Sequence, residues 1–137
     1  MRISESGLAY GRGYVYNLKY HIVWCTKYRK KILVDDIEAA LKNEIRNTCN
    51  ELGVNIITFE CMSDHIHLLL DCSPQVFIPT IIKILKGNAA RRLFIQYPEL
   101  KKQLYDGHLW NPSYFVATVS ENSQQQIEEY INKQKEK

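Results

Sequence analysis

The spacing of hydrophobic residues along the chain alternates between a period of two and a period near 3.6. Stretches with the shorter period, or with many β-branched and aromatic residues, predict strands. These stretches are residues 14–26, 54–62, 65–71 and 114–119. The dipeptide Ser63-Asp64 separates the second stretch from the third and suits a tight turn, so these two strands are expected to form a hairpin.

Helical spacing of apolar residues predicts two helices between these strands. The first is expected to begin at Asp35 or Asp36 and to end before Gly53, a residue type that commonly follows a helix C-terminus. The second is expected to begin near Pro79, because proline suits the first turn of a helix, and to run to about Gln96.

Residues 122–137 form the last predicted helix. Ser123 and Gln126 have the spacing of a capping box, in which two side chains satisfy backbone N–H groups at the helix start. Tyr130 and Gln134 follow at a spacing of four residues. Both side chains are therefore expected on one side of this helix.

The first six predicted elements occur in the order strand, helix, strand, strand, helix, strand. This order predicts an α+β fold of the ferredoxin-like βαββαβ type, in which two helices cover one face of an antiparallel sheet. The other face is left for a third helix, a ligand or a second subunit. A length of 137 residues fits a single domain over 1–137. Within that domain we expect residues 1–13 to be a flexible N-terminal segment.

Composition adds few restrictions to this picture. Hydrophobic residues make up 45% of the chain and charged residues 24%, which is ordinary for a globular protein. No apolar run approaches the roughly 20 residues that span a bilayer, and the first residues lack the apolar core of a secretion signal. We therefore expect a cytoplasmic protein with no membrane partner. The four cysteines lack zinc-ligand spacing, and we interpret them as reduced core residues.

Basic residues gather in two segments, one after the first predicted strand and one along the second predicted helix. The formal net charge of +3 permits nucleic acid as a partner without requiring it. Candidates for contacts with DNA phosphates are Arg29, Lys30, Lys31, Lys83, Lys86, Arg91 and Arg92. Helical geometry does not place the last four on one side of the helix, so we expect about half of them to be solvated without a DNA contact.

Two histidines, His65 and His67, stand on either side of Ile66 in an otherwise apolar strand. Because alternate side chains of a strand point to the same face, both imidazoles are expected to project from one face while Ile66 enters the other. Two imidazoles on a rigid strand are well placed to share a metal ion. The alternative is a pair of structural histidines satisfied by hydrogen bonds beside the core. The pairing favours metal binding over that alternative.

Tyr130 and Gln134 are the second candidate pair. Tyr130 carries an oxygen that can act as a nucleophile, and the amide oxygen of Gln134 can bind a hard cation. A tyrosine among isoleucines in an amphipathic helix is far more often a packing residue. The spacing of this pair alone is weak evidence for a catalytic role.

Taken together, these residues are similar to a known family. His65-Ile66-His67 has the HUH pattern of histidine, hydrophobic residue and histidine, and a downstream helix carries a tyrosine. The chain resembles the single-tyrosine HUH transposases of small bacterial and archaeal insertion sequences from about Tyr20 to Gln134. The blocks that carry the resemblance are Tyr20-His21-Ile22-Val23-Trp24-Cys25-Thr26-Lys27-Tyr28-Arg29, Met62-Ser63-Asp64-His65-Ile66-His67-Leu68-Leu69, Leu85-Lys86-Gly87, Leu109-Trp110, Ser113-Tyr114-Phe115-Val116 and Tyr130-Ile131 with Gln134.

The resemblance implies a role for each of these side chains. His65, His67 and Gln134 would hold a divalent metal ion, Mg²⁺ or Mn²⁺, and Tyr130 would be the nucleophile. Members of the family bind DNA hairpins at the ends of the element, cut a single strand beside them and rejoin the ends. The resemblance also implies a homodimer, in which the tyrosine helix of one subunit completes the active site of the other in trans.

Three other functions are compatible with parts of the sequence. A non-catalytic RNA-binding or single-strand-binding module can have the same element order, although such modules carry a Lys/Arg-Gly-Phe/Tyr motif that this chain lacks. A domesticated relative would process repeated genomic hairpins without moving an element of its own. A metal-dependent hydrolase would attack with water and leave no covalent link between protein and DNA.

Overall fold

The computed structural model describes residues 2–3, 9–11, 14–104, 107–120 and 122–134. Its main element is a four-stranded antiparallel sheet with the strand order β5-β6-β4-β7. The strands are β4 (Lys19–Cys25), β5 (Asn55–Cys61), β6 (His65–Asp71) and β7 (Phe115–Thr118). With the helices between them, they give the predicted βαββαβ order. The ferredoxin-like α+β fold is therefore confirmed.

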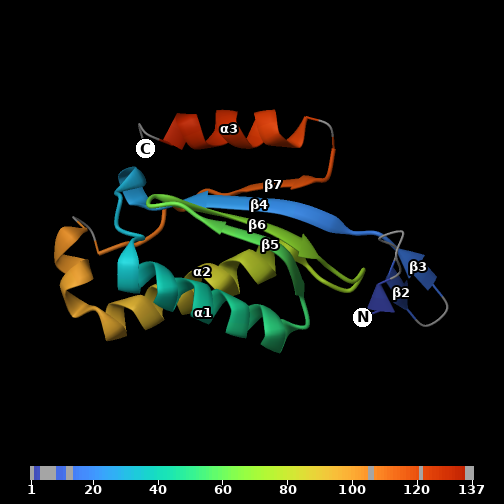
Figure 1. The fold of residues 1–137 in the computed structure, drawn as a ribbon, viewed down its shortest axis with the longest axis horizontal. Helices are drawn as coiled ribbons and strands as arrows, with labels where there is room; N and C mark the ends of the chain where they lie inside the picture. The colour runs from blue at the N-terminus through green and yellow to red at the C-terminus, as the bar shows by residue number, and fades with distance from the viewer. Residues whose placement is uncertain (1, 4–8, 12–13, 105–106, 121, 135–137) are drawn as a thin grey trace.

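Two long helices cover one face of this sheet (Figure 1). They are α1 (Asp35–Leu52) and α2 (Ile78–Gln96). Gly53 ends α1 in the left-handed conformation, with a φ of 70°, as the sequence predicts. Alternate residues of β6 enter the core between the sheet and these helices, since Ile66, Leu68 and Leu70 have no exposed surface. Burial of this apolar layer is the main stabilising contribution to the fold.

The third helix, α3 (Ser123–Lys133), lies on the opposite face of the sheet, over β7 and β4 (Figure 1). The sheet face for which the sequence predicted no covering helix between the strands is thus partly covered by the C-terminal helix of the same chain. Ile127 of α3 is buried, at 2% exposure, and anchors the helix on that face. The last three residues of the predicted segment 122–137 lie outside the described residues.

The predicted strand over residues 14–26 is wrong in one respect, because the structure divides it. Tyr14–Tyr16 forms β3, which pairs with β2 (Ala9–Gly11), and β2 pairs with β1 (Arg2–Ile3) in a small separate sheet. Two residues, 17 and 18, then connect β3 to β4 of the main sheet. A continuous hydrophobic pattern does not reveal such a change of pairing partner. The flexibility of residues 1–13 stays a prediction.

The predicted capping box at the start of α3 is also wrong. The Ser123 hydroxyl accepts a hydrogen bond from the Ser120 N–H at 2.9 Å and donates one to the Thr118 carbonyl at 3.2 Å. It therefore closes the turn between β7 and α3, and the helix start at Asn122 has no side-chain capping hydrogen bond. No helix among the described residues is both long and apolar enough to cross a membrane.

Candidate active site

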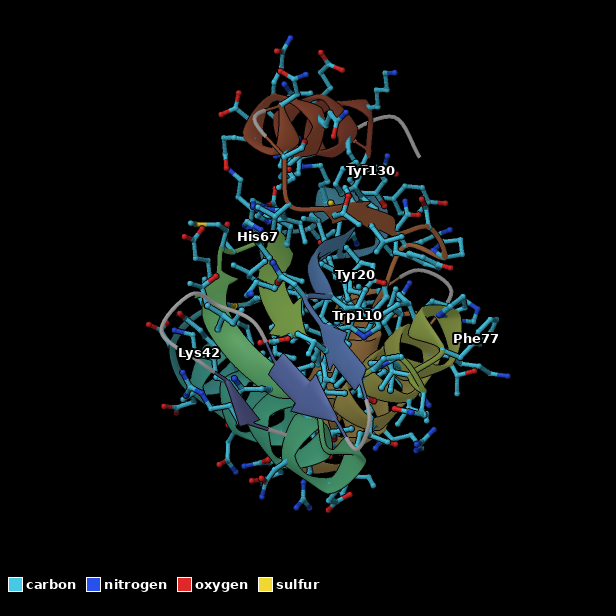
Figure 2. All side chains as sticks on the ribbon, turned by 90° about the vertical axis from the view of Figure 1, so that its right-hand side faces the viewer. Tyr20, Lys42, His67, Phe77, Trp110 and Tyr130 are labelled. Atoms are coloured by element: carbon cyan, nitrogen blue, oxygen red, sulfur yellow. The ribbon has the colours of Figure 1, made fainter. Side chains whose placement is uncertain are left out.

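The alternation of β6 directs His65 and His67 to the face of the sheet that α3 partly covers. Because Ile66 and Leu68 are buried against α1 and α2, the two histidines between and beside them project the other way. Both imidazoles are partly accessible, with 16% and 14% of their side-chain surfaces exposed. In Figure 2 the labelled His67 and Tyr130 lie on the side of the sheet nearer α3. The predicted orientation of the histidine pair is confirmed.

His65 is held in one orientation by its neighbour Asp64. The His65 Nδ1 lies 2.8 Å from Asp64 Oδ1, and Asp64 Oδ2 accepts a hydrogen bond from Arg29 Nε at 2.9 Å. Burial alone would raise the pKa of the Asp64 carboxyl, but the hydrogen bonds from His65 and Arg29 outweigh it and lower that pKa. An ionised carboxylate on Nδ1 keeps the proton there, so the lone pair of His65 is presented at Nε2.

His67 contacts a third histidine, His21 of β4. The His67 Nε2 lies 2.9 Å from His21 Nδ1, and the His67 Nδ1 lies 3.8 Å from Glu60 Oε2. Burial lowers the pKa of His67 and also that of His21, which favours two neutral rings sharing one N–H···N hydrogen bond. His21 pairs with Leu69 across the strands, so it approaches His67 from the side away from His65.

The contact of His21 with His67 was not predicted from the sequence. The strand alternation of residues 19–25 does put His21 on the same face as His67 once the pairing of β4 with β6 is known. The sequence alone does not give that register. The sequence shows a histidine at position 21, but it does not show that His67 is its neighbour.

Tyr130 points from α3 toward the start of β7. Its hydroxyl donates a hydrogen bond to Ser113 Oγ at 3.0 Å, and its ring centroid lies 5.8 Å from that of Phe115. Burial raises the pKa of Tyr130, and the hydrogen bond with Ser113 offsets only part of that rise. The phenol is therefore protonated at neutral pH, and it would have to lose its proton to act as a nucleophile.

Gln134 follows Tyr130 by one turn and is buried, with 3% of its surface exposed. Its Nε2 donates to the Tyr130 carbonyl at 3.1 Å, whereas its Oε1 is fully buried and has no hydrogen-bond partner among the described residues. A buried amide oxygen without a partner is costly. A cation would satisfy it.

Arg29 connects α3 with the histidine strand. Besides its bond to Asp64, its Nη1 donates to the Ile131 carbonyl of α3 at 3.3 Å. The fold thus brings the tyrosine helix to the end of the sheet where His65 lies opposite Cys25.

These side chains fit a hard divalent ion bound by nitrogen and amide oxygen. Within the described parts of the chain, no three His, Cys, Asp or Glu side chains are grouped so that they could hold a metal ion. A metal held by the histidine pair would need an amide or a backbone oxygen as a further ligand, and the unpartnered Gln134 Oε1 is an oxygen of that kind.

A comparison with protein families decides the identity of this arrangement. The family described as "Transposase IS200 like" matches residues 14–134, which include every candidate residue of the site. The chain belongs to the IS200-like transposase family. It is accordingly a transposase, and its reaction is the transposition of single-stranded DNA.

Individual transposases agree with this assignment. The ISDra2 transposase TnpA of Deinococcus radiodurans is 51% identical over 127 residues, covering 93% of this chain and 91% of that protein. The transposase for insertion sequence element IS200 of Salmonella typhimurium is 34% identical over 132 residues, covering 96% and 84%. Among solved structures, that of a putative transposase from Deinococcus radiodurans superposes with a TM-score of 0.87 at 48% identity, covering 92% and 97%.

A more distant solved structure shares the fold alone. It is the REP-associated tyrosine transposase bound to a REP hairpin, with a TM-score of 0.57 and 12% identity, covering 88% of this chain and 67% of that one. Its relation to this transposase is therefore one of architecture.

The basic residues predicted to contact DNA occupy three kinds of position in this transposase. Lys31 and Lys83 are exposed. Arg91 and Arg92 are also exposed, but Arg91 donates to Asn88 Oδ1 and Arg92 Nε lies 3.5 Å from Glu44 Oε2. Arg29, Lys30 and Lys86 instead turn toward the protein, and their partners are Asp64, the Gln103 carbonyl and the carbonyls of residues 111 and 113.

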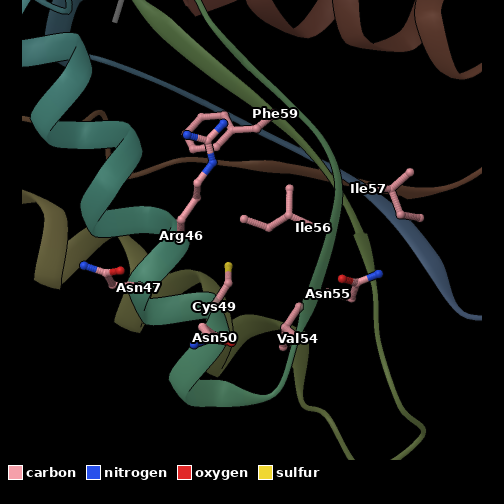
Figure 3. Close-up of a pocket in the computed structure, with 9 residues that line it drawn as sticks. All are labelled: Arg46, Asn47, Cys49, Asn50, Val54, Asn55, Ile56, Ile57 and Phe59. Carbon is pink, nitrogen blue, oxygen red and sulfur yellow. The ribbon is translucent and has the colours of Figure 1, made fainter. Parts of the chain in front are cut away.

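A cavity of about 500 Å³ lies away from this site, between α1 and β5 (Figure 3). Its walls include Arg46, whose guanidinium stands 5.6 Å from the Phe59 ring centroid, and Cys49. None of the predicted catalytic, metal-binding or DNA-binding residues lines it. The chemistry of the transposase is therefore not expected there.

Proposed function

We propose that this transposase cuts and rejoins single-stranded DNA with Tyr130 as the nucleophile, and that His65, His67 and Gln134 hold Mg²⁺ or Mn²⁺. The observation that carries the proposal is the contact of Arg29 with both sides of the site. Arg29 bonds to Asp64, which orients His65, and to the Ile131 carbonyl, next to Tyr130. The histidine strand and the tyrosine helix are thus joined through one side chain.

The reaction is a transesterification at a DNA phosphate. The Tyr130 oxygen forms a bond to phosphorus, the bond to the 3′ oxygen breaks, and the phenol proton is lost while the 3′ oxygen gains one. The products are a 5′-phosphotyrosine link and a free 3′-hydroxyl. Because the link keeps the phosphoryl group activated, a second 3′-hydroxyl can reverse the step and join new ends without ATP.

Different residues of the chain have different roles in this step. Ser113 holds the phenol before substrate binds, and its hydroxyl must release the Tyr130 oxygen for attack. Asp64 fixes the tautomer of His65, and Gln134 offers its unpartnered oxygen. A bound divalent ion would polarise the phosphate and stabilise the charge that develops in the transition state.

We further propose DNA hairpins as the partner that positions the strand. A hairpin-bound relative shares the fold, and exposed basic residues are available on this chain for phosphate contacts. Lys31, Lys83, Arg91 and Arg92 are the exposed candidates. The weaker candidates are the inward-facing Arg29, Lys30 and Lys86, because their charged groups already have protein partners.

The proposal also includes a homodimer with active sites completed in trans. In the single chain, α3 rests on its own sheet through Ile127 and through the bond from Arg29 to the Ile131 carbonyl. The same contacts can be made by the α3 of a partner, because exchange of an identical element preserves every interaction. The short segment between β7 and α3 would then connect the two subunits.

The experiment that tests this function is covalent capture of DNA. Single-stranded oligonucleotides from the DNA flanking the gene are incubated with protein and Mg²⁺ or Mn²⁺, and the products are separated on a denaturing gel. We expect a metal-dependent protein–DNA adduct in the wild type and in Tyr114→Phe, and none in Tyr130→Phe. Tyr114 is a matched control, because it is a partly exposed tyrosine beside Ser113.

Other outcomes of this experiment identify other functions. Cleavage without an adduct would show a hydrolase that uses water as the nucleophile. Binding without cleavage would show a non-catalytic binding module. An adduct that persists in Tyr130→Phe would contradict the assignment of the nucleophile.

A further inference from the structure

A cavity of about 470 Å³ lies beside the site, between the 3-10 turn η1 (Lys27–Arg29), α2 and the segment before β7. Its lining residues are Lys27, Lys86, His108, Trp110, Asn111 and Pro112. The cavity adjoins the end of β4, since Thr26 forms a bridge with Trp110 and the Asn111 N–H donates to the Cys25 carbonyl. His65 pairs with Cys25 at this same end of the sheet.

Lys86 is a half-buried cation at this cavity and forms no ion pair within the part of the chain that the structure describes. Its Nζ donates to the Asn111 carbonyl at 2.8 Å and to the Ser113 carbonyl at 3.2 Å. Burial lowers the pKa of Lys86 to about 8, and within the described residues no carboxylate opposes that effect; the nearby Cys25 thiol is the one group that raises it. When a partly buried ammonium group is bonded only to carbonyl oxygens, these bonds do not fully offset the free energy of removing its charge from water.

Other cations of the chain show how unusual this environment is. Arg29 is paired with Asp64, Lys42 with Glu38 and Arg92 with Glu44. At the cavity, in contrast, a second lysine joins the first, because Lys27 also lines it. Its Nζ lies 5.1 Å from the Tyr28 ring centroid. Two ammonium groups around one cavity repel each other unless an anion enters.

The position of the cavity relates it to the nucleophile. Ser113 gives its carbonyl to Lys86 and its hydroxyl to Tyr130, so a single residue separates the cation from the tyrosine. Trp110 forms a rigid wall, because its Nε1 donates to the Lys86 carbonyl at 3.0 Å and its ring packs edge-on against Trp24. A charged group bound here is thereby held at a fixed place relative to Tyr130.

We infer that this cavity binds one backbone phosphate of the DNA strand that reaches Tyr130, with Lys27 and Lys86 as its cationic contacts. The inference rests on the proposed function, since it concerns the same strand. It assigns to Lys27 a contact that the sequence did not predict. The inward-facing Lys86, which the sequence predicted to contact a hairpin phosphate, would instead contact a phosphate beside the active site.

The test measures single-strand binding by fluorescence anisotropy of a labelled oligonucleotide at several salt concentrations. The protein carries Tyr130→Phe, so that no adduct forms, and is compared with the same protein carrying Lys27→Met or Lys42→Met. Each phosphate contact contributes about 0.7 to the slope of log affinity against log salt for a single strand. We expect Lys27→Met to lower that slope by about 0.7, equivalent to about fivefold weaker binding at 0.1 M salt. Lys42, a lysine of α1 that pairs with Glu38 and does not line the cavity, serves as the matched control and should leave the slope unchanged.

A second measurement covers Lys86 without replacing it, because replacement would remove its two carbonyl contacts within the fold. Because the pKa of Lys86 is lowered to about 8, its amine is unusually reactive toward an acetylating reagent at that pH. We expect saturating oligonucleotide to protect Lys86 and Lys27 from acetylation, read by mass spectrometry, and to leave Lys42 unprotected. An unchanged slope in Lys27→Met together with unprotected Lys86 would overturn the inference.

Failure of this inference and failure of the proposed function are distinguishable. If the slope and protection change as expected while the wild type forms no metal-dependent adduct, the phosphate site stands and the catalytic proposal fails. If the wild type forms the adduct but neither readout changes, the catalytic proposal stands and the phosphate site is wrong.

Discussion

The two faces of the central sheet differ in what their side chains require. On the face covered by α1 and α2, residues such as Ile66, Leu68 and Leu70 are fully buried in an apolar layer. On the face toward α3, His67 is half-buried against His21, and the buried Gln134 Oε1 has no partner among the described residues. The first face is packed with apolar side chains, and its buried Trp24 Nε1 also has no partner among the described residues, whereas the second face has histidine and amide atoms that a metal ion would satisfy. Stability and chemistry are thus carried by alternate residues of the same strand.

The largest effect that separates the two faces is expected from His65→Ala. Loss of this side chain should reduce adduct formation by at least about 1,000-fold, because a metal ion contributes several kcal/mol to the transition state. The free energy of unfolding should fall by no more than about 1.5 kcal/mol, the contribution of one hydrogen bond. Adduct yield on a gel and urea denaturation measure the two quantities. A large loss of stability would show that the histidine belongs to the core.

Leu68→Ala, three residues further along β6, should give the opposite result. Its side chain is fully buried against the helices, so its truncation should lower the free energy of unfolding by about 2–5 kcal/mol. Activity per folded molecule should change little at a temperature where the variant is folded. Urea denaturation followed by circular dichroism gives the stability. An unchanged midpoint would contradict the division between the two faces.

A smaller effect is expected from Asp64→Asn. The amide oxygen can still accept the hydrogen bond from His65 Nδ1, but the negative charge that fixes the tautomer and pairs with Arg29 is lost. We expect Mn²⁺ affinity to fall by about tenfold, the lower end of the range for residues that orient metal ligands. Isothermal titration calorimetry measures it. Unchanged affinity would show that Asp64 serves only the packing of Arg29.

The smallest effect is expected from His21→Ala, which should raise the affinity for Mn²⁺ where Asp64→Asn lowers it. The His21 hydrogen bond occupies Nε2 of His67 on the side away from His65, so the metal has to displace it. Removal of a hydrogen bond of about 0.5–1.5 kcal/mol should tighten Mn²⁺ binding by about twofold to tenfold. Calorimetry on the same protein preparation tests this. Weaker binding would instead make His21 a supporting ligand.

The sequence predicted the elements whose hydrophobic period is undisturbed. The alternation of residues 65–71 gave both the core side chains and the direction of His65 and His67, and α1 has the expected start at Asp35 and end before Gly53. These features depend on local periodicity, which a single sequence contains.

Features that depend on pairing between distant segments could not be predicted. The contact of His21 with His67 follows from the register of β4 on β6, and the division of residues 14–26 follows from the pairing of β3 with β2. Likewise, the basic character of Arg29 and Lys86 was visible, but their inward partners lie 35 and 25 residues away along the chain. Residue type indicates the available chemistry, and only the fold decides which groups meet.

The most direct test of the account is the position of a bound metal ion, because it requires no knowledge of the DNA substrate. Crystals of the protein soaked in Mn²⁺ would be measured at the manganese absorption edge, and the anomalous peak located. The account predicts one peak on the α3 side of the sheet, bonded to His65 and His67 and adjacent to Gln134. A peak elsewhere, or full occupancy that leaves His65 unbound, would contradict the assignment of this face as the catalytic one.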